Sequence, residues 1–231
     1  MNVELLELAA SRLDDLLPEV VFVGGAVVGL WITDPGAPPA RPTKDVDVVV
    51  EVTTRGAYYD FEARLRERGL VPDRESEILC RYRDRESELI LDAMPPDADI
   101  LGFASRWQKE SLPHSIDRLL PSGASIRVVS PPCLLATKLE AFAGRGGGDL
   151  LGSRDFADII SLVDGRAELV DEVAGSHDGF RAFVAEEIGV LLNMPRIQDG
   201  LHGAVPSDAS ARVDLVVLPA LLRLAGRSES P

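Results

Sequence analysis

Two aspartates one residue apart in a valine-rich segment constrain this chain more than any other feature. Residues 45–52 read DVDVVVEV, a composition typical of a β-strand. Because side chains alternate between the two faces of a strand, Asp45 and Asp47 share one face and the adjoining valines take the other. Two like charges side by side on an apolar strand are costly unless a cation neutralises them. Mg²⁺ prefers oxygen ligands of this kind, so the pair is a candidate metal site.

A third aspartate ends another apolar segment. Asp92 closes the sequence ELILD, in the second of two predicted strands that a charged turn at residues 84–86 joins. If this strand lies near the first, the three carboxylates converge and can hold two divalent ions. The alternative is that Asp45 and Asp47 lie on the exposed face of an edge strand, and the pattern of two aspartates alone does not decide between these interpretations.

A glycine pair precedes the aspartate strand. Residues 20–23 predict a buried strand, Gly24 and Gly25 a tight turn, and residues 26–32 a short helix. Such a turn before a helix N-terminus lets a phosphate approach backbone amide donors closely. Glycine pairs are common in turns, so the signal is weak alone. It becomes more specific because a proline-rich loop at residues 34–42 and the aspartate strand follow it.

The order of the predicted elements gives an α+β fold class, with a mixed N-terminal half and a mostly helical C-terminal half. We predict strands at residues 20–23, 45–52, 78–83, 88–93 and 125–129, and helices at 1–19, 26–32, 56–68, 134–143, 154–163, 166–174, 180–192 and 210–225. Pro18 should end the first helix, and Pro219 should kink or divide the last one.

Composition and charge narrow the functional class. The chain is 45% hydrophobic and 27% charged, as is ordinary for a soluble protein, and no segment approaches the roughly 18 apolar residues of a membrane span. We expect a cytoplasmic protein, with Cys80 and Cys133 as reduced thiols. A net charge of −14 argues against tight nonspecific binding to nucleic acid, although bound cations can help to grip such a substrate locally. Arginines gather between Arg64 and Arg85, as either a basic rim or a mixed-charge surface.

The segments VGGAVVGL, TKDVDVVV and LILD resemble the core signature of the nucleotidyltransferase superfamily with the polymerase-β-like fold. Further along, LATKLEAFAGRGGGDLLGSRDFADII resembles the lysine–arginine and Arg-Asp…Asp block of the AbiEii/AbiGii toxin family. These are the nucleotidyltransferase toxins of bacterial toxin–antitoxin and phage-defence systems. The resemblance runs from about Val21 to Ile160 and implies a catalytic core over residues 1–130. A helical lobe over residues 131–231 would pack on that core as one structural unit.

The resemblance also implies roles for particular residues. Asp45, Asp47 and Asp92 would be the catalytic metal ligands, Lys138 would contact the nucleotide phosphates, and Asp155 would be a later essential acid. Arg145 and Asp158 match the same block, Arg145 as a nucleotide-binding candidate and Asp158 as a further candidate. Where the family has glycine–serine, this chain has Gly24 and Gly25, so backbone amides would have to bind the phosphates without a serine hydroxyl.

The residues themselves leave alternatives open for several candidates. Lys138 and Arg145 are seven apart on one helix face, where they suit phosphate or pair with neighbouring acids. Asp155 and Asp158 begin the next helix and equally suit its dipole. Thr43, Lys44 and Arg81 are nucleotide-binding candidates; a turn before the strand explains the first two equally well, and a surface position explains Arg81.

The expected activity is the transfer of a nucleoside monophosphate from an NTP donor to an acceptor hydroxyl, with Mg²⁺ or Mn²⁺ as cofactor and pyrophosphate as product. The resemblance implies an RNA acceptor such as tRNA, growth inhibition, and a neighbouring antitoxin as partner. A small molecule or a protein is an alternative acceptor, and the acidic charge favours a cationic small molecule. The remaining alternative is that the chain is not an enzyme but a non-catalytic nucleotide-binding module.

Overall fold

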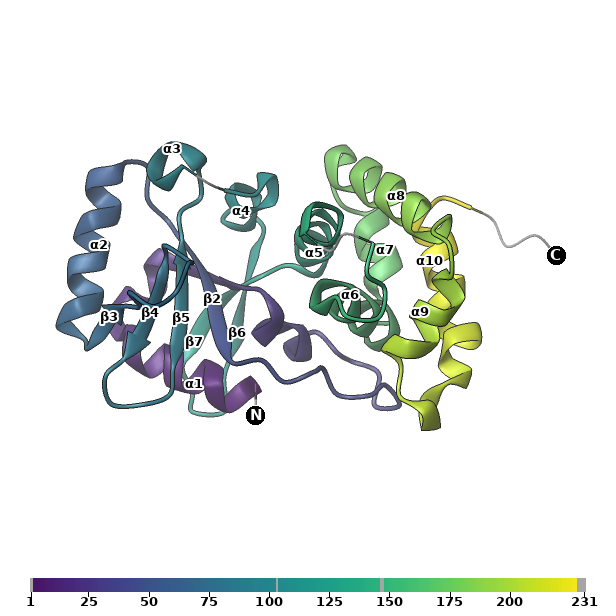
Figure 1. Cartoon of the computed structure of the whole chain (residues 1–231), viewed down its shortest axis with the longest axis horizontal. Coiled ribbons are helices and arrows are strands. Elements are labelled where there is room, and N and C mark those ends of the chain that lie inside the picture. The colour runs from purple at the N-terminus through teal and green to yellow at the C-terminus, as the bar shows by residue number, and fades with distance from the viewer. Residues whose placement is uncertain (1, 103, 146–147, 228–231) are drawn as a thin grey trace. The chain divides into compact units, whose positions relative to one another are not determined.

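The computed structural model describes residues 2–102, 104–145 and 148–227 of the chain. It divides into two compact units. Unit 1 comprises residues 1–27 and 42–130, and unit 2 comprises residues 28–41 and 131–231. Figure 1 labels the α-helices of both units and the strands β2 to β7. The strands assigned in the described residues all belong to unit 1, whereas unit 2 is helical.

Unit 1 is built on a seven-stranded mixed sheet in the order β3-β4-β5-β2-β1-β7-β6. Its strands are β1 (Val20–Val23), β2 (Asp45–Val50), β3 (Leu70–Pro72), β4 (Arg81–Asp84), β5 (Ile90–Met94), β6 (Ser115–Leu119) and β7 (Ser125–Val129). The β2–β5 and β1–β7 pairs are parallel, and the other pairs are antiparallel. The aspartate strand β2 pairs with β1 on one side and β5 on the other, so it is a central strand and the edge-strand interpretation is wrong.

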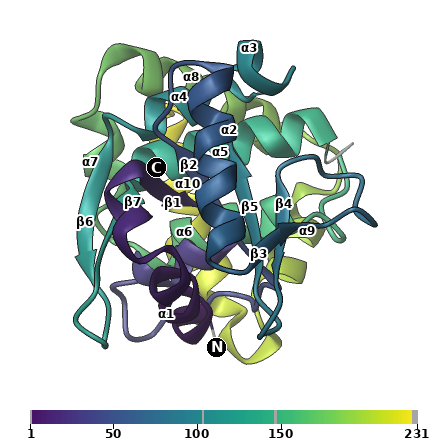
Figure 2. The ribbon, with the colours of Figure 1, turned by 90° about the vertical axis from the view of Figure 1, so that its left-hand side faces the viewer.

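The helices of unit 1 are short or amphipathic. They are α1 (Asn2–Leu13), η1 (Asp14–Glu19), α2 (Arg55–Glu67), α3 (Ala98–Leu101) and α4 (Arg106–Ser111), where η1 is a 3-10 helix. Figure 2 shows α1 and α2 in front of the sheet. The side chain of Thr54 caps α2 by accepting a hydrogen bond from the Ala57 amide, and α2 buries Tyr58, Phe61 and Leu65 at helical spacing.

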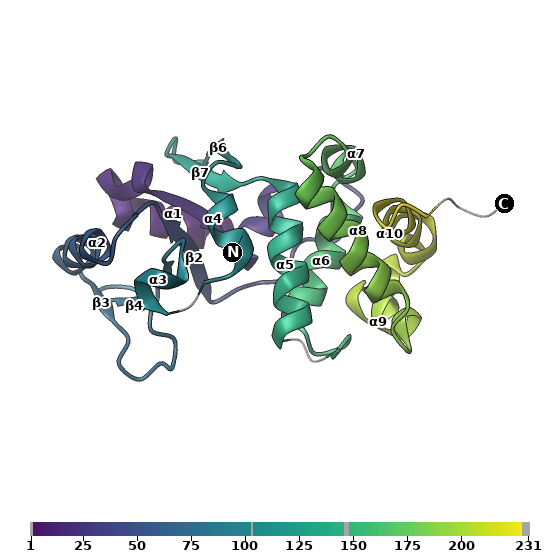
Figure 3. The same cartoon turned by 90° about the horizontal axis from the view of Figure 1, so that it is seen from above.

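Unit 2 is a helical bundle. Its elements are α5 (Pro131–Arg145), α6 (Arg154–Gly165), α7 (Leu169–Ala174), α8 (Asp178–Leu192), α9 (Ile197–Ala204), η3 (Ser207–Ala209), η4 (Val213–Val217) and α10 (Leu218–Leu224). Helix α5 packs against α6, α7 and α8, and α8 lies between α5 and α10 (Figure 3). No helix in the described residues is long and apolar enough to cross a membrane.

The loop at residues 33–41 belongs to unit 2 because specific contacts hold it there. The amides of Thr33 and Asp34 both donate to the carbonyl of Gly165, at 2.8 and 3.0 Å. Arg212 then joins Asp34 to Asp164, with N–O distances of 2.6 and 2.7 Å. Proline rings add stiffness to the loop. The 3-10 helix η2 (Gly25–Leu30) leads into this loop from unit 1.

The α+β class with a helical C-terminal region is confirmed, and the differences from prediction are local. Residues 26–32 were predicted as a short helix, and the chain forms the 3-10 helix η2 there. The first α-helix ends at Leu13 and continues as η1, which contains Pro18. Pro219 lies in the first turn of α10, and the helical run continues from the π-helix η4 directly into α10. The short elements β3, β6, α3, α4 and α9 were not predicted.

Candidate active site

The three predicted metal ligands lie on neighbouring central strands of unit 1. In the parallel pairing of β2 with β5, Asp47 is the register partner of Asp92. Asp45 is two residues before Asp47, so its side chain emerges on the same face of the sheet. The side chains of Asp45 and Asp92 are 30% and 7% exposed. The fold therefore brings the three acids together, although they come from segments more than 40 residues apart.

Arg81 lies on the same face and binds two of these acids. It is the register partner of Asp92 in the β4–β5 pair. Its Nε donates to Asp92 Oδ1 at 2.8 Å, and its Nη2 donates to Asp92 Oδ2 at 2.7 Å, which makes a bidentate pair. The same Nη2 also donates to Asp45 Oδ2 at 2.9 Å. Arg81 thus bridges two acids and occupies part of the space that their carboxylates share.

Burial and charge act in opposite directions on this cluster. Burial raises the pKa of Asp92, while the hydrogen bonds and charge of Arg81 oppose that rise. The hydrogen bond to Asp92 raises the pKa of Arg81, which stays charged. Burial also raises the pKa of the Cys80 thiol to about 12, so Cys80 is neutral at pH 7 and supplies no thiolate.

Gly24 forms the turn beside Asp47. Its φ is +74°, a left-handed conformation that glycine adopts without strain. A Cβ added at Gly24 would lie 1.9 Å from Asp47 Oδ2, so the carboxylate occupies the place of a side chain. Gly25 begins η2. Gly24 is half-buried and Gly25 is buried, so the turn lies directly against the Asp47 carboxylate.

Thr43 and Lys44 precede β2. The Thr43 hydroxyl donates to the Asp45 carbonyl at 2.6 Å, and the Thr43 amide donates to Asn2 Oδ1 at 3.2 Å. Lys44 is exposed. The contacts of Thr43 fix the start of the aspartate strand. They agree with the interpretation of this residue as part of a turn before the strand.

A second cluster of charged residues is buried in unit 2. Lys138 on α5 reaches Asp155 and Asp158 in the first turns of α6, with Nζ–Oδ distances of 3.2 and 2.6 Å. Arg41 from the proline-rich loop adds a second cation, since its Nε and Nη2 lie 2.8 and 2.9 Å from the two oxygens of Asp158. All three α5 and α6 residues are buried. Ser153 caps α6, and Asp155 lies in the first turn, where an acid also suits the helix dipole. The side chain of Arg145, which ends α5, lies outside the described part of the structure.

Arg41 is a site residue that the sequence did not reveal. It stands in a loop without periodicity, and its partner Asp158 is 117 residues away. Its only sequence signal is that it is the one basic residue among the prolines at 34–42.

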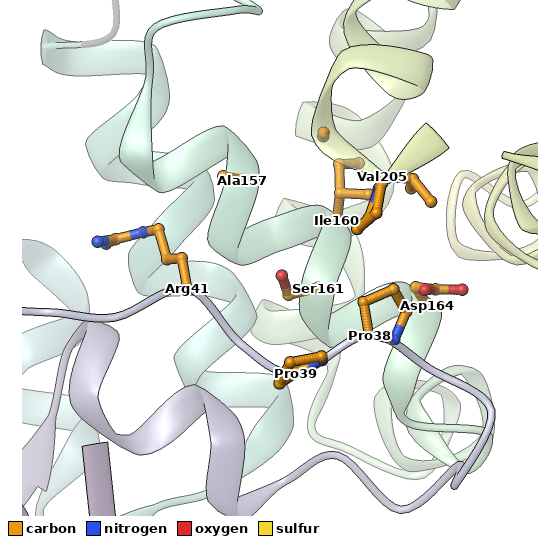
Figure 4. Close-up of a pocket in the computed structure, with 10 residues that line it drawn as sticks. Pro38, Pro39, Arg41, Ala157, Ile160, Ser161, Asp164 and Val205 are labelled. Carbon is orange, nitrogen blue, oxygen red and sulfur yellow. The ribbon is translucent and has the colours of Figure 1, made fainter. Parts of the chain in front are cut away.

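A small pocket of about 180 Å³ lies in unit 2 beside this cluster. It is lined by Pro38, Pro39, Arg41, Ala157, Ile160, Ser161, Asp164, Ala204, Val205 and Pro206. In Figure 4 the Arg41 guanidinium points away from Ser161 and Asp164, in keeping with its pairing to Asp158. Arg41 belongs to both the pocket and the cluster, whereas none of the predicted site residues lines the pocket.

The arginines between residues 64 and 85 form a mixed-charge surface. Arg64 pairs with Glu19, Arg66 with Glu62, Arg68 with Asp15, and Arg83 with Asp73. Each of these guanidinium groups has an acidic partner close by. A basic rim made of these arginines is therefore largely neutralised.

The acids of unit 1 fit a hard divalent cation. They offer carboxylate oxygens only, which suit Mg²⁺ or Mn²⁺ better than softer metals. A cationic guanidinium already bridges two of them, which is direct evidence that positive charge is favoured between these carboxylates. The buried neutral thiol of Cys80 does not change this oxygen ligand set.

Comparison with known proteins assigns the chain to a family. The model of the family described as "Nucleotidyl transferase AbiEii toxin, Type IV TA system" matches residues 7–210. No curated protein matches the chain. Among solved structures, a similar chain is an antigenic nucleotidyltransferase-like protein from Paracoccidioides brasiliensis, with 18% identity, a TM-score of 0.47, and coverage of 90% of this chain and 95% of that one. Because the family model covers both the three acids and the Lys138 block, the chain belongs to the AbiEii nucleotidyltransferase toxin family of type IV toxin–antitoxin systems.

Proposed function

We propose that this protein transfers a nucleoside monophosphate from an NTP to an acceptor hydroxyl, uses Mg²⁺ or Mn²⁺, and releases pyrophosphate. The observation that carries the proposal is the convergence of Asp45, Asp47 and Asp92 on one face of the central strands. Three carboxylates on one face of the central strands repel one another, and Arg81 bridges Asp45 and Asp92. Their mutual repulsion is a cost that a divalent cation relieves.

The three acids share one role in this scheme, and Asp92 has a second. Asp45, Asp47 and Asp92 would hold the divalent ions. When bound, these ions neutralise phosphate charge and lower the barrier to attack by a hydroxyl. Asp92 is also the proposed base that takes the proton of the acceptor hydroxyl.

The donor's phosphates need their own contacts. We assign them to the backbone amides of the Gly24–Gly25 turn, because Gly24 leaves no side chain between the turn and Asp47. Lys138 is the proposed ammonium partner for phosphate. Asp155 is the proposed essential acid that holds Lys138, and Asp158 shares that task while it also binds Arg41. Arg145 remains a proposed nucleotide contact on sequence grounds.

The acceptor is proposed to be RNA, with tRNA as the first substrate to test and an antitoxin as the functional partner of the toxin. The proposal rests on the membership in a toxin nucleotidyltransferase family. The net charge of −14 and the neutralised arginines favour a second class of acceptor, a cationic small molecule, which the acidic protein would attract.

The first test is nucleotide transfer to RNA. Purified protein with Mg²⁺ would receive each α-labelled NTP in turn, together with total bacterial RNA. Controls would be the double variant Asp45→Asn/Asp47→Asn and the variant Asp117→Asn, which removes an exposed carboxylate on β6. We expect label in the tRNA band with the wild type and Asp117→Asn, and none with the double variant. Circular dichroism would establish that the double variant is folded.

The outcomes separate the parts of the proposal. Full transfer by the double variant would reject the assignment of the acids. Labelling of an added aminoglycoside or of a protein, with no label in RNA, would keep the chemistry and replace the acceptor. If nucleotide bound independently of Mg²⁺ and no acceptor was labelled, the protein would be a non-catalytic nucleotide-binding module.

A further inference from the structure

Arg81 makes contacts that a residue reserved for phosphate binding would not need. Three hydrogen bonds of 2.7–2.9 Å join its guanidinium to Asp92 and Asp45. Its side chain is only 17% exposed. The strand register fixes it there, since the backbone of Arg81 faces that of Asp92 across the sheet. The contact is therefore built into the fold and does not depend on a flexible surface rotamer.

The two contacts of Arg81 differ in strength. The pair with Asp92 is bidentate and nearly buried, so it benefits from ideal geometry and low exposure. The contact with Asp45 uses only Nη2, which already serves Asp92, and the Asp45 side chain is more exposed. Asp45 is thus the acid that Arg81 can release at the lower cost.

A divalent ion and Arg81 compete for the same carboxylates. The oxygen of Asp45 that accepts the Nη2 hydrogen bond is a potential metal ligand, and two cations near one carboxylate repel each other. Because a guanidinium already satisfies Asp45 and Asp92, ion binding must overcome that interaction. The measured metal affinity is then the free energy of binding the ion minus the free energy of the guanidinium contact that the ion displaces.

We propose that Arg81 sets the metal affinity of this site, by neutralising Asp45 and Asp92 in the metal-free protein and by competing with the divalent ion for Asp45. The proposal rests on the proposed function, in which these acids are the metal ligands. It gives Arg81 a positioning role: it keeps the acids together when no ion is bound and limits how tightly the ion is held.

The strand β4 supplies a matched control. Arg83 lies two residues beyond Arg81, on the same strand and the same face, but it is 54% exposed and pairs with Asp73. Replacing Arg83 removes an equal charge from the same strand without touching Asp45 or Asp92. Arg81→Gln therefore removes the competitor of the divalent ion, whereas Arg83→Gln leaves it in place. Arg81→Lys keeps the charge and loses the bidentate geometry.

The test is a titration of the four proteins with Mn²⁺ in the absence of nucleotide, at pH 8, with free Mn²⁺ measured by electron paramagnetic resonance. We expect Arg81→Gln to bind Mn²⁺ about tenfold or more tightly than the wild type. Arg81→Lys should lie between the two, and Arg83→Gln should match the wild type. Arg81→Lys keeps the test informative if Arg81→Gln does not fold.

Thermal unfolding gives a second readout. Metal-free Arg81→Gln should melt at a lower temperature than the wild type, because Asp92 loses its buried partner. Mn²⁺ should then raise its melting temperature by more than it raises that of the wild type, since tighter binding to the native state stabilises it more. An arginine with a structural role alone would lower the melting temperature equally with and without Mn²⁺.

The outcomes distinguish this proposal from the proposed function. If Asp45→Asn/Asp47→Asn loses Mn²⁺ binding while Arg81→Gln and Arg81→Lys bind it no more tightly than the wild type, Arg81 does not compete and the acids remain metal ligands. If Asp45→Asn/Asp47→Asn binds Mn²⁺ as the wild type does, the metal assignment fails, and the role of Arg81 fails with it.

Discussion

At the scale of single residues, Gly24 and Asp47 are matched to each other. A glycine is needed at residue 24 for two separate reasons, the left-handed backbone and the carboxylate that fills the place of a side chain. The hairpin turn between β6 and β7 contains Gly123, which has a φ of +90° and no atom within 4 Å of an added Cβ. Gly123 thus shares the left-handed backbone of Gly24, but it has no neighbouring side chain in the place of its own.

We therefore predict that Gly24→Ala destabilises the protein more than Gly123→Ala does. Each alanine has a left-handed φ, which costs about 1–3 kcal/mol. At residue 24 the clash with Asp47 adds about 1–3 kcal/mol, as overpacking does. Urea unfolding measures the free energy of both variants. Equal losses would mean that Asp47 moves aside without cost and that the contact is not specific.

Asp158 is the residue on which the cluster in unit 2 depends. It is buried and accepts from both Lys138 and Arg41. Replacement by alanine would leave Lys138 with Asp155 and would remove the carboxylate that pairs with Arg41, so we predict a loss of about 3–5 kcal/mol in the free energy of unfolding. The exposed pair Arg196–Asp199 in the same unit is the control, because Asp199→Ala should change that free energy by less than about 1 kcal/mol. Similar losses in the two variants, measured by urea unfolding, would show that the Asp158 cluster contributes no more than a surface pair.

At the scale of elements, the loop at residues 33–41 is held to unit 2 by one arginine between two acids. Arg212 binds Asp34 and Asp164, and the pKa values of the two acids are shifted in opposite directions. The hydrogen bond from Arg212 lowers the pKa of Asp34 below its usual 3.8. Burial raises the pKa of Asp164, and Arg212 opposes that rise. On acidification, Asp164 therefore takes up its proton before Asp34 does.

The stabilisation by Asp34 should have a defined pH window. Since the pKa of Asp34 is lower in the folded than in the unfolded protein, its contribution is fully present above 3.8 and is lost as the pH falls through the folded value. Asp34→Asn should thus lower the melting temperature by a constant amount at about pH 5–7, because Asp34 is ionised there in both the folded and the unfolded protein. The difference from the wild type should narrow below pH 3.8. Melting curves at a series of pH values measure this. A difference that stays constant below that pH would mean that Asp34 keeps its usual pKa in the folded protein.

The elements that the sequence predicted are those with a strong local pattern. The valine-rich β2, the amphipathic α2 and the apolar β7 are recognisable from their own residues. Short strands such as β3 and β6 are stabilised by pairing with neighbouring strands. They contain too few residues to show a clear alternation of apolar and polar side chains. The acids were found because they interrupt apolar strands. The pairing of Arg81 with Asp45 and of Arg41 with Asp158 was not predicted. Strand order joins the first pair across 36 residues, and loop packing joins the second across 117.

At the scale of the whole molecule, charge is the dominant property. The net charge is −14, and four arginines of the segment between residues 64 and 85 are paired with acids in the structure, namely Arg64, Arg66, Arg68 and Arg83. An acidic protein repels the phosphate backbone at long range, so contact with RNA must be local and specific. Asp15 and Glu19 are the acids that neutralise Arg64 and Arg68.

We predict that RNA without an acceptor site binds with a Kd weaker than about 10⁻⁴ M at physiological salt, the weak end of nonspecific binding. The double variant Asp15→Asn/Glu19→Gln should bind it more tightly, because it releases Arg64 and Arg68. Asp208→Asn/Asp214→Asn changes the net charge equally at exposed positions in unit 2 and is the matched control. Fluorescence anisotropy of a labelled RNA hairpin measures all three proteins. If both double variants gained affinity equally, net charge alone would control RNA binding. If the wild type bound the hairpin at micromolar concentration, its surface would hold a basic region that the ion pairs do not neutralise.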